Sequence, residues 1–168
     1  MTGSPQLRPL GETLGTEALG VDLSRLDDAT FAWIERAFAE HPVLVFRDQK
    51  LGPAGTKLYT LEENERMTDK KYAEQPRPAV IPHPVTGRPI LFVNPMHVHG
   101  FVGMERAEAW ELIEELAAHA TQDRFVYYHS WRVGDLLIWD ERATMHRGAG
   151  DYHPEERRVM LRTIVYPN

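Results

Sequence analysis

The fold is decided by residues Trp131–Arg162, which read WRVGDLLIWDERATMHRGAGDYHPEERRVMLR. Gly134-Asp135 is typical of a tight turn, so we expect a strand, a turn and a second strand over Leu136 to Trp139. A polar loop follows His146, and the apolar residues of 159–166 predict a last strand. An imidazole followed by spaced guanidiniums suits a metal beside an arginine that binds a carboxylate.

The segments that precede this stretch add two helices and several strands. Helical spacing of apolar residues predicts two helices. The first can be capped by Asp27 or Asp28 and ends at His41-Pro42, and the second covers 105–120. The apolar run Val43–Phe46 predicts a buried strand. Two further strands are expected over 79–81 and 90–93, joined as a hairpin by a turn centred on Thr86-Gly87, and another over 125–131. Residues 1–27 are expected to form an extended lead-in. Strands linked by tight turns, with few helices, favour a mostly β sandwich or jelly roll with flanking helices.

Residues 50–78 differ in composition from the rest of the chain. They are polar, contain several Pro and Gly residues, and offer few side chains for a core. Such a length is unusual for a connection inside a compact domain, so we interpret the segment as a lid, a linker or a place where something is missing.

Composition excludes several classes of function. The 168 residues suit one domain, and the net charge of −6 gives no general attraction to nucleic acid or to an anionic membrane. The chain has no cysteine, which excludes disulfides, zinc–thiolate sites and thiol nucleophiles and fits a reducing cytosol. No apolar run is long enough for a signal peptide or a membrane span. We therefore expect a cytoplasmic protein without nucleic-acid or membrane partners.

The arginines after His146 stand out in an acidic chain. Arg158 and Arg162 share a face if the strand is regular, and a planar guanidinium can bind a carboxylate through two hydrogen bonds. The alternative is that these arginines lie on the surface and pair with Glu155 and Glu156. For His146, the alternative to a metal ligand is a structural histidine held by hydrogen bonds.

Two further histidines, His97 and His99, lie two residues apart in a loop. In an extended segment both could face one metal ion, together with His146. The alternative is a loop with polar, solvent-exposed histidines, because motifs this short are weak evidence. Taken from the residues alone, no catalytic residue is certain.

The quoted stretch resembles the TauD/TfdA family of Fe(II)/2-oxoglutarate-dependent dioxygenases. That family carries W-x-x-G-D-x-x-x-W-D-N-R-x-x-x-H-R, followed by Y and by R-R-x-x-x-R-x-T. HPVTGRPILFVNPMH, residues 83–97, is similar to a second segment of the family, and LGTEALGVDLSRLDD with HPVLVFRDQKL is similar to its N-terminus. The resemblance covers both ends of the chain and implies a double-stranded β-helix, or jelly roll.

The resemblance also implies roles for individual residues. His146 matches the distal iron-binding histidine, and Arg158 matches the arginine that binds the far carboxylate of 2-oxoglutarate. Arg157 competes for that role, because the spacing from His146 is one residue longer than in taurine dioxygenase. Arg162 matches the arginine that faces an acidic substrate.

One part of the family pattern is missing. Family members carry an H-x-D pair on an early barrel strand, which supplies the other two iron ligands, and no His-x-Asp occurs in this sequence. In the family this pair falls in the interval that residues 50–78 occupy here. We therefore expect a single domain over 1–168, incomplete in the first half of its jelly roll, with 50–78 as a linker that replaces the missing strands.

Two functional hypotheses follow from the resemblance. The first is an enzyme that uses Fe(II) and the cosubstrate 2-oxoglutarate to hydroxylate a small anionic molecule, such as a sulfonate or carboxylate. Its missing ligands would come from a segment outside this chain, another subunit, or His97 and His99. The second is a shortened, inactive homologue that binds 2-oxoglutarate or a partner protein without turnover. Exposed sheet edges also predict a homo-oligomer.

Overall fold

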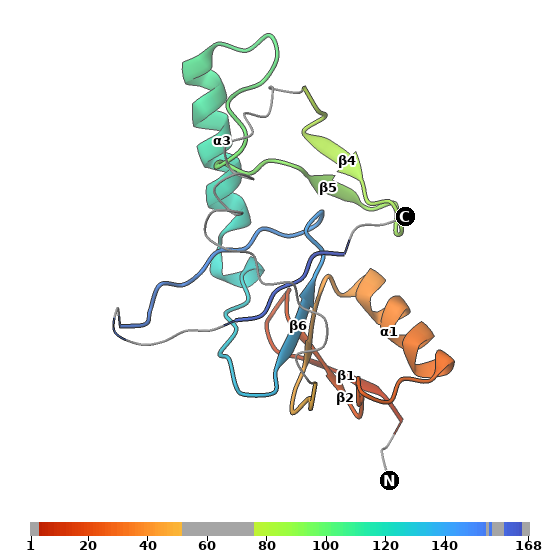
Figure 1. The fold of residues 1–168 in the computed structure, drawn as a ribbon. Coiled ribbons are helices and arrows are strands. Elements are labelled where there is room, and N and C mark those ends of the chain that lie inside the picture. Colours follow the sequence, from red (N-terminus) through yellow and green to blue (C-terminus); the bar gives the residue numbers. More distant parts are fainter. Residues whose placement is uncertain (1–3, 52–75, 154, 156–159, 166–168) are drawn as a thin grey trace, which may run out of the picture. The chain divides into compact units, whose positions relative to one another are not determined.

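A computed structural model describes residues 4–51, 76–153, 155 and 160–165 (Figure 1). The chain divides by its contacts into two units, one of residues 1–51 and 76–145 and the other of residues 52–75 and 146–168. All the helices and strands described below belong to the first unit. The predicted linker falls mostly outside the described residues, and the prediction of a single domain stays a prediction.

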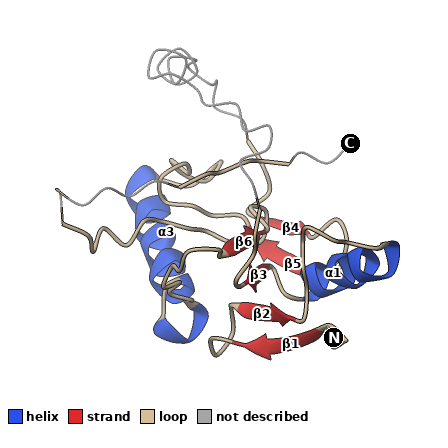
Figure 2. Ribbon diagram, turned by 60° about the horizontal axis from the view of Figure 1, so that its bottom comes forward, coloured by secondary structure: helices blue, strands red, loops and turns tan. Residues whose placement is uncertain are grey.

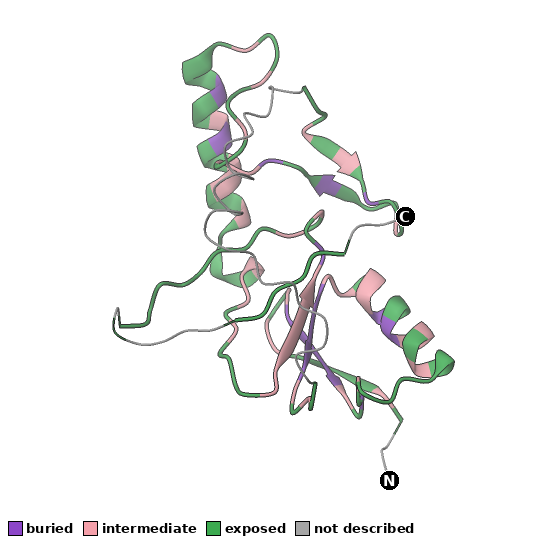
Figure 3. Cartoon of the chain, viewed as in Figure 1, coloured by how far each residue is buried: buried purple, intermediate pink, exposed green. Residues whose placement is uncertain are grey.

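A four-stranded sheet forms the centre of the first unit, with the strand order β1-β2-β3-β6. Its strands are β1 (Gln6–Pro9), β2 (Thr16–Leu19), β3 (Val43–Phe46) and β6 (Leu136–Trp139). β3 pairs parallel to β2 and antiparallel to β6, so it is an interior strand, and all four of its residues are buried (Figure 3). The continuous apolar run that predicted a buried strand is confirmed.

Helix α1 (Asp28–Glu40) supplies the second layer of this core. The Asp27 carboxylate accepts a 2.7 Å hydrogen bond from the Thr30 N–H and caps the first turn. Ile34 and Ala37 are buried on the helix face that packs in one cluster with Leu44 and Phe46. Predicted from spacing and capping, the helix is confirmed, and it ends before Pro42.

A second, two-stranded sheet is formed by β4 (Val80–Pro82) and β5 (Pro89–Leu91), which pair antiparallel (Figure 2). The turn between them contains Gly87 at a φ of 69°, a conformation that glycine adopts without strain. Helix α3 (Arg106–Ala120) follows, and the short 3₁₀ helix η1 (Asp123–Phe125) comes after it. The predicted hairpin and the predicted second helix are both confirmed.

The extended lead-in contains two strands that were not predicted, because β1 and β2 form an antiparallel pair. Two other expectations about strands were wrong. Residues 126–131 form no strand. The Tyr127 ring packs over the turn at Gly15, and the His129 ring bonds to Asp135. These side-chain contacts hold the segment in place of backbone pairing with a neighbouring strand. Residues 160–165, the described part of the last predicted strand, form no strand.

Gly15 allows the Tyr127 ring to approach the backbone closely. Its φ is 84°, and a Cβ built on it would lie 2.4 Å from the ring. We expect Gly15→Ala to lower the free energy of unfolding by about 2–4 kcal/mol, because left-handed strain and steric overlap add. Gly87→Ala is the matched control, since its φ is 69° with nothing within 4 Å. Urea unfolding followed by circular dichroism compares them, and equal losses would contradict the packing argument.

Candidate functional site

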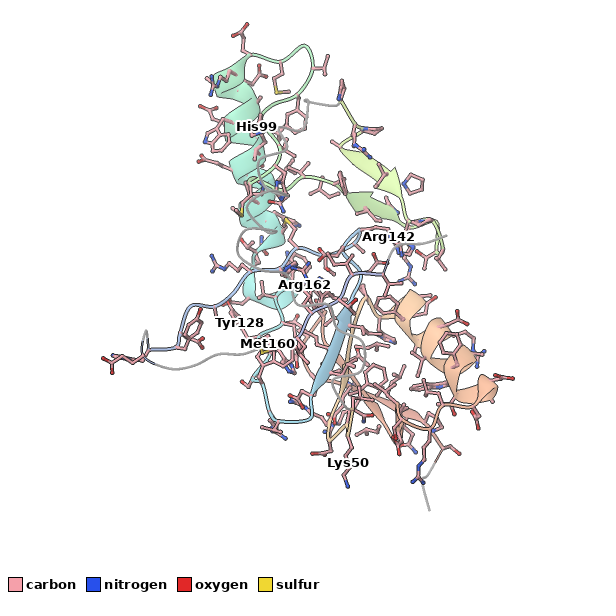
Figure 4. The ribbon with its side chains drawn as sticks, viewed as in Figure 1. Lys50, His99, Tyr128, Arg142, Met160 and Arg162 are labelled. Carbon is pink, nitrogen blue, oxygen red and sulfur yellow. The ribbon has the colours of Figure 1, made fainter. Side chains whose placement is uncertain are left out.

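His146 and Arg162 belong to the second unit, and both are exposed. Figure 4 labels Arg162 among the drawn side chains. Arg157 and Arg158 lie outside the described residues, so the predicted 2-oxoglutarate-binding arginine has no structural description. The assignments of these four residues therefore stay predictions.

His97 and His99 occupy the loop between β5 and α3, and both are exposed. Asn94 organises the loop, because its side-chain oxygen accepts from the Met96 N–H at 2.9 Å. Its carbonyl accepts from the N–H groups of His97 and Val98 at 2.9 and 2.8 Å. The loop is thus a closed turn held by its own backbone rather than an extended segment. The extended geometry that would let both histidines face one metal ion is not found.

Among the described residues, no three His, Asp or Glu side chains lie close enough together to hold a metal ion. This result bears on every imidazole, because all eight histidines of the sequence are among the described residues. An octahedral Fe(II) site of the two-histidine, one-carboxylate type needs three such donors around one point. The donors of the described residues do not fit that group.

A buried polar cluster of the first unit surrounds Asp140, the residue that follows β6. Its Oδ1 accepts from the Arg142 backbone N–H at 2.9 Å and from Arg142 Nε at 2.8 Å. Its Oδ2 accepts from Arg142 Nη2 at 2.6 Å and lies 2.9 Å from Nε2 of His83. The Arg142 guanidinium lowers the pKa of the Asp140 carboxyl far below its usual value, and His83 adds to the effect.

These four contacts occupy the Asp140 carboxylate. An ionised carboxylate offers about four lone-pair sites, and each of these is used by a donor from Arg142 or His83. Both Asp140 and His83 are buried, at 6% and 7% exposure. Asp140 comes six residues before His146 in the sequence, but with its lone pairs occupied it is not available as the missing carboxylate ligand.

A second buried carboxylate, Asp135, lies just before β6. Its Oδ2 forms a salt bridge with Nη1 of Arg47 and accepts from the Arg132 N–H at 2.8 Å. The same oxygen lies 3.1 Å from Nε2 of His129, whose Nδ1 is 2.9 Å from the Tyr127 hydroxyl. Burial lowers the pKa of His129, and the Arg47 charge lowers it further.

Sequence reasoning used the two aspartates only as parts of turn and family patterns, and it missed their partners. His83 and Arg47 are far from them in sequence, so no local spacing reports the contacts. The available signal was chemical, because an aspartate at each end of an apolar strand requires a buried cation or donor. Each end of β6 is thus fixed by a buried carboxylate.

Comparison with known proteins identifies the chain. The family model described as "Taurine catabolism dioxygenase TauD, TfdA family" matches residues 6–62 and 54–164. The two matched segments together span most of the sequence. This chain belongs to the TauD/TfdA family. The family expectation from the sequence is therefore confirmed.

Curated members of the TauD/TfdA family match over part of their length. An alpha-ketoglutarate-dependent 2,4-dichlorophenoxyacetate dioxygenase of Burkholderia sp. is 41% identical over 115 residues, covering 64% of this chain and 38% of the relative. An (S)-phenoxypropionate/alpha-ketoglutarate-dioxygenase of Delftia acidovorans is 36% identical over 125 residues, covering 73% and 40%. The chain thus spans about two fifths of the length of these relatives.

Solved structures support the fold of the TauD/TfdA family. A taurine dioxygenase from Burkholderia xenovorans superposes with a TM-score of 0.66 at 22% identity, covering 83% of this chain and 82% of that one. AAD-2, crystallised with Mn(II) and N-oxalylglycine, gives 0.65 at 18% identity and covers 83% and 88%. At these identities the likeness shows the fold, which is mostly β with flanking helices.

Proposed function

We propose that this TauD/TfdA member serves as an Fe(II)/2-oxoglutarate-dependent dioxygenase that hydroxylates a small anionic substrate, such as a sulfonate or carboxylate. The observation that carries the proposal is the family match across 54–164, which includes the whole of Trp131–Arg162. Relatives named for 2,4-dichlorophenoxyacetate and (S)-phenoxypropionate support an anionic substrate, because both names denote carboxylic acids.

The roles follow the chemistry of the side chains. His146 is proposed as an iron ligand through a neutral imidazole nitrogen. Arg158, or Arg157 in its place, is proposed to bind the far carboxylate of 2-oxoglutarate through two parallel hydrogen bonds. Arg162 is proposed to attract the anionic substrate. When bound, iron would supply the activation of oxygen that the side chains of this protein do not provide.

Because no three donors of the described residues form a metal site, the proposal requires further iron ligands from outside those residues. The other parts of this chain, another subunit or an additional polypeptide segment would provide them. The same requirement favours a homo-oligomer, which we include in the proposal.

We also propose that the fold is a jelly roll incomplete in its first half, and that the protein is cytoplasmic. Within the part of the chain that the structure describes, no helix is both long and apolar enough to cross a membrane.

A second candidate function is favoured by the missing H-x-D pair and the occupied Asp140 carboxylate. In this case the chain is a shortened homologue that binds 2-oxoglutarate or a partner protein without turnover. An arginine and a binding pocket suffice for such binding, because the carboxylate–guanidinium contact does not need the metal. The two functions differ in one measurable product.

Succinate is that product. Purified protein is incubated with Fe(II), ascorbate, 2-oxoglutarate and, in turn, taurine, phenoxyacetate and 2,4-dichlorophenoxyacetate. The enzyme proposal predicts succinate release that rises with one of these acids and falls to background in His146→Ala. Absence of release with every acid would overturn it.

Calorimetric titration with 2-oxoglutarate tests the second function. We expect Arg158→Gln to weaken binding by about 30- to 150-fold, because a charge-assisted pair of hydrogen bonds contributes about 2–3 kcal/mol. Arg88→Gln is the control, since Arg88 forms an exposed ion pair with Glu40. Binding without succinate supports the inactive homologue. Absence of both binding and succinate contradicts the enzyme and the homologue that binds 2-oxoglutarate.

A further inference from the structure

Both ring nitrogens of His83 form hydrogen bonds. His83 lies in the turn after β4, where its Nδ1 accepts from the N–H groups of Val85 and Thr86 at 3.2 and 3.1 Å. On the other side its Nε2 lies 2.9 Å from Oδ2 of Asp140. A nitrogen that faces two N–H donors must carry a lone pair, so the ring proton is on Nε2 and is donated to Asp140. His83 is therefore a neutral imidazole of fixed tautomer.

Asp140, in turn, organises the segment that follows β6. Its side chain holds the Arg142 N–H and guanidinium, as described above. Its backbone carbonyl accepts from the N–H groups of Ala143 and Thr144 at 3.1 and 3.0 Å, and from the Thr144 hydroxyl at 2.7 Å. The side chain and carbonyl of one residue therefore fix the turn 140–144. Figure 4 labels Arg142 in this turn.

The contact between His83 and Asp140 joins segments that are distant in sequence. His83 belongs to the β4–β5 hairpin and Asp140 follows β6, 57 residues later. Arg88 of the same hairpin also forms an ion pair with Glu40 of α1, at 2.8 Å, and the two side chains are 65% and 57% exposed. An exposed pair of this kind contributes little, whereas a buried, fully hydrogen-bonded one restricts the groups that it joins.

We infer that His83 is a positioning residue. By donating from Nε2 it fixes the Asp140 carboxylate, and through Asp140 it fixes the turn from which the chain runs on to His146, two residues after Thr144. The inference rests on the proposed function in one respect, namely that the turn matters because it leads to His146. The hydrogen bonds from His83 through Asp140 to the turn 140–144 involve only described residues of the first unit.

Two substitutions at His83 test the hydrogen bonds of Nδ1 and Nε2 separately. The side-chain oxygen of His83→Asn can replace Nδ1 as the acceptor of the Val85 and Thr86 N–H groups, as asparagine does in turns, but its amide is too short to reach Asp140. The amide nitrogen of His83→Gln reaches the position of Nε2 and can donate to Asp140. A positioning role therefore predicts rescue by glutamine and loss with asparagine.

Amide hydrogen exchange, measured by NMR, reads the turn directly. In His83→Asn we expect exchange at Ala143 and Thr144 to be about tenfold faster than in the wild type, because one buried hydrogen bond is lost. In His83→Gln it should stay within about twofold. Exchange in β3 should change little in both variants. Arg88→Gln, on the same hairpin, should leave all these amides unchanged.

The ¹⁵N shifts of the His83 ring provide an independent signature. They should report a neutral ring with its proton on Nε2, and a proton on Nδ1 would overturn the inference. Equal acceleration at Ala143, Thr144 and the β3 amides in His83→Asn would also overturn it, because this pattern reports general destabilisation. Neither measurement uses iron, 2-oxoglutarate or substrate, so absence of succinate release would leave the inference standing.

Discussion

Asp135→Ala is expected to lower the free energy of unfolding by about 3–5 kcal/mol. The variant removes the acceptor shared by the Arg47 guanidinium, the Arg132 N–H and the His129 ring. The Arg47 side chain is only 15% exposed, so its charge would remain largely buried without its partner. The loss of this compensation, rather than the loss of one contact, accounts for the size of the effect.

Urea unfolding followed by circular dichroism measures this loss. Asp123→Ala is the control, because Asp123 is exposed in the first turn of η1 and should change stability by less than about 1 kcal/mol. Asp135→Asn should fall between the two, since it keeps an acceptor oxygen but not the charge. A value for Asp135→Ala near that of the control would show that Arg47 finds another partner or moves into solvent.

Acid is expected to destabilise the protein through Asp140. The pKa of this carboxyl is lowered in the folded state, chiefly by its hydrogen bonds with Arg142. Below pH 4 the unfolded chain therefore binds a proton that the folded chain still excludes, so stability falls as the pH falls. The contribution is fully present above the unfolded value near 3.8 and is lost progressively toward the lower folded value. Its size is on the order of 2–3 kcal/mol.

Urea midpoints between pH 6 and pH 2 test this expectation. Asp140→Asn should be less stable at pH 6 and should show a shallower decline than the wild type. Asp123→Asn provides the matched control, because its carboxylate is exposed and its replacement should leave the slope unchanged. A wild-type slope retained in Asp140→Asn would assign the acid sensitivity to other carboxylates.

The elements predicted correctly have strong local signals. In three elements the local sequence determines the structure within a few residues. They are α1, with Asp27 and its spaced apolar residues, β3, with its β-branched and aromatic run, and the turn around Gly87. The family was predicted from the order of residues between Trp131 and Arg162. These are features that neighbouring residues along the chain determine, so sequence alone reports them.

The parts that were missed depend on distant partners. β1 and β2 are short strands whose pairing becomes favourable only with β3 alongside. The segment 126–131 is rich in aromatic residues, as many strands are. Its Tyr127 ring instead packs over Gly15, and its His129 ring bonds to Asp135. Likewise the His83–Asp140 contact spans 57 residues, and no spacing rule encodes it.

In the candidate site, too, residue type and local pattern could be predicted from the sequence, whereas the contacts could not. His146 and Arg162 were singled out by residue type and family resemblance, and the structure describes both as exposed. The suggestion that His97 and His99 share a metal ion depended on an extended loop, whereas Asn94 closes that loop into a turn.

The pairing of β3 with β6 also has a consequence for biosynthesis. Phe46 pairs with Leu136, 90 residues later. At about 5–20 residues per second, a ribosome needs roughly 5–20 s to deliver the partner strand after β3 is made. During that interval Val43–Phe46, among the most buried residues of the native protein, lacks one of its two neighbouring strands. Nascent chains of this protein should therefore depend on chaperones that shield short apolar segments, and slower translation downstream of β3 should increase aggregation.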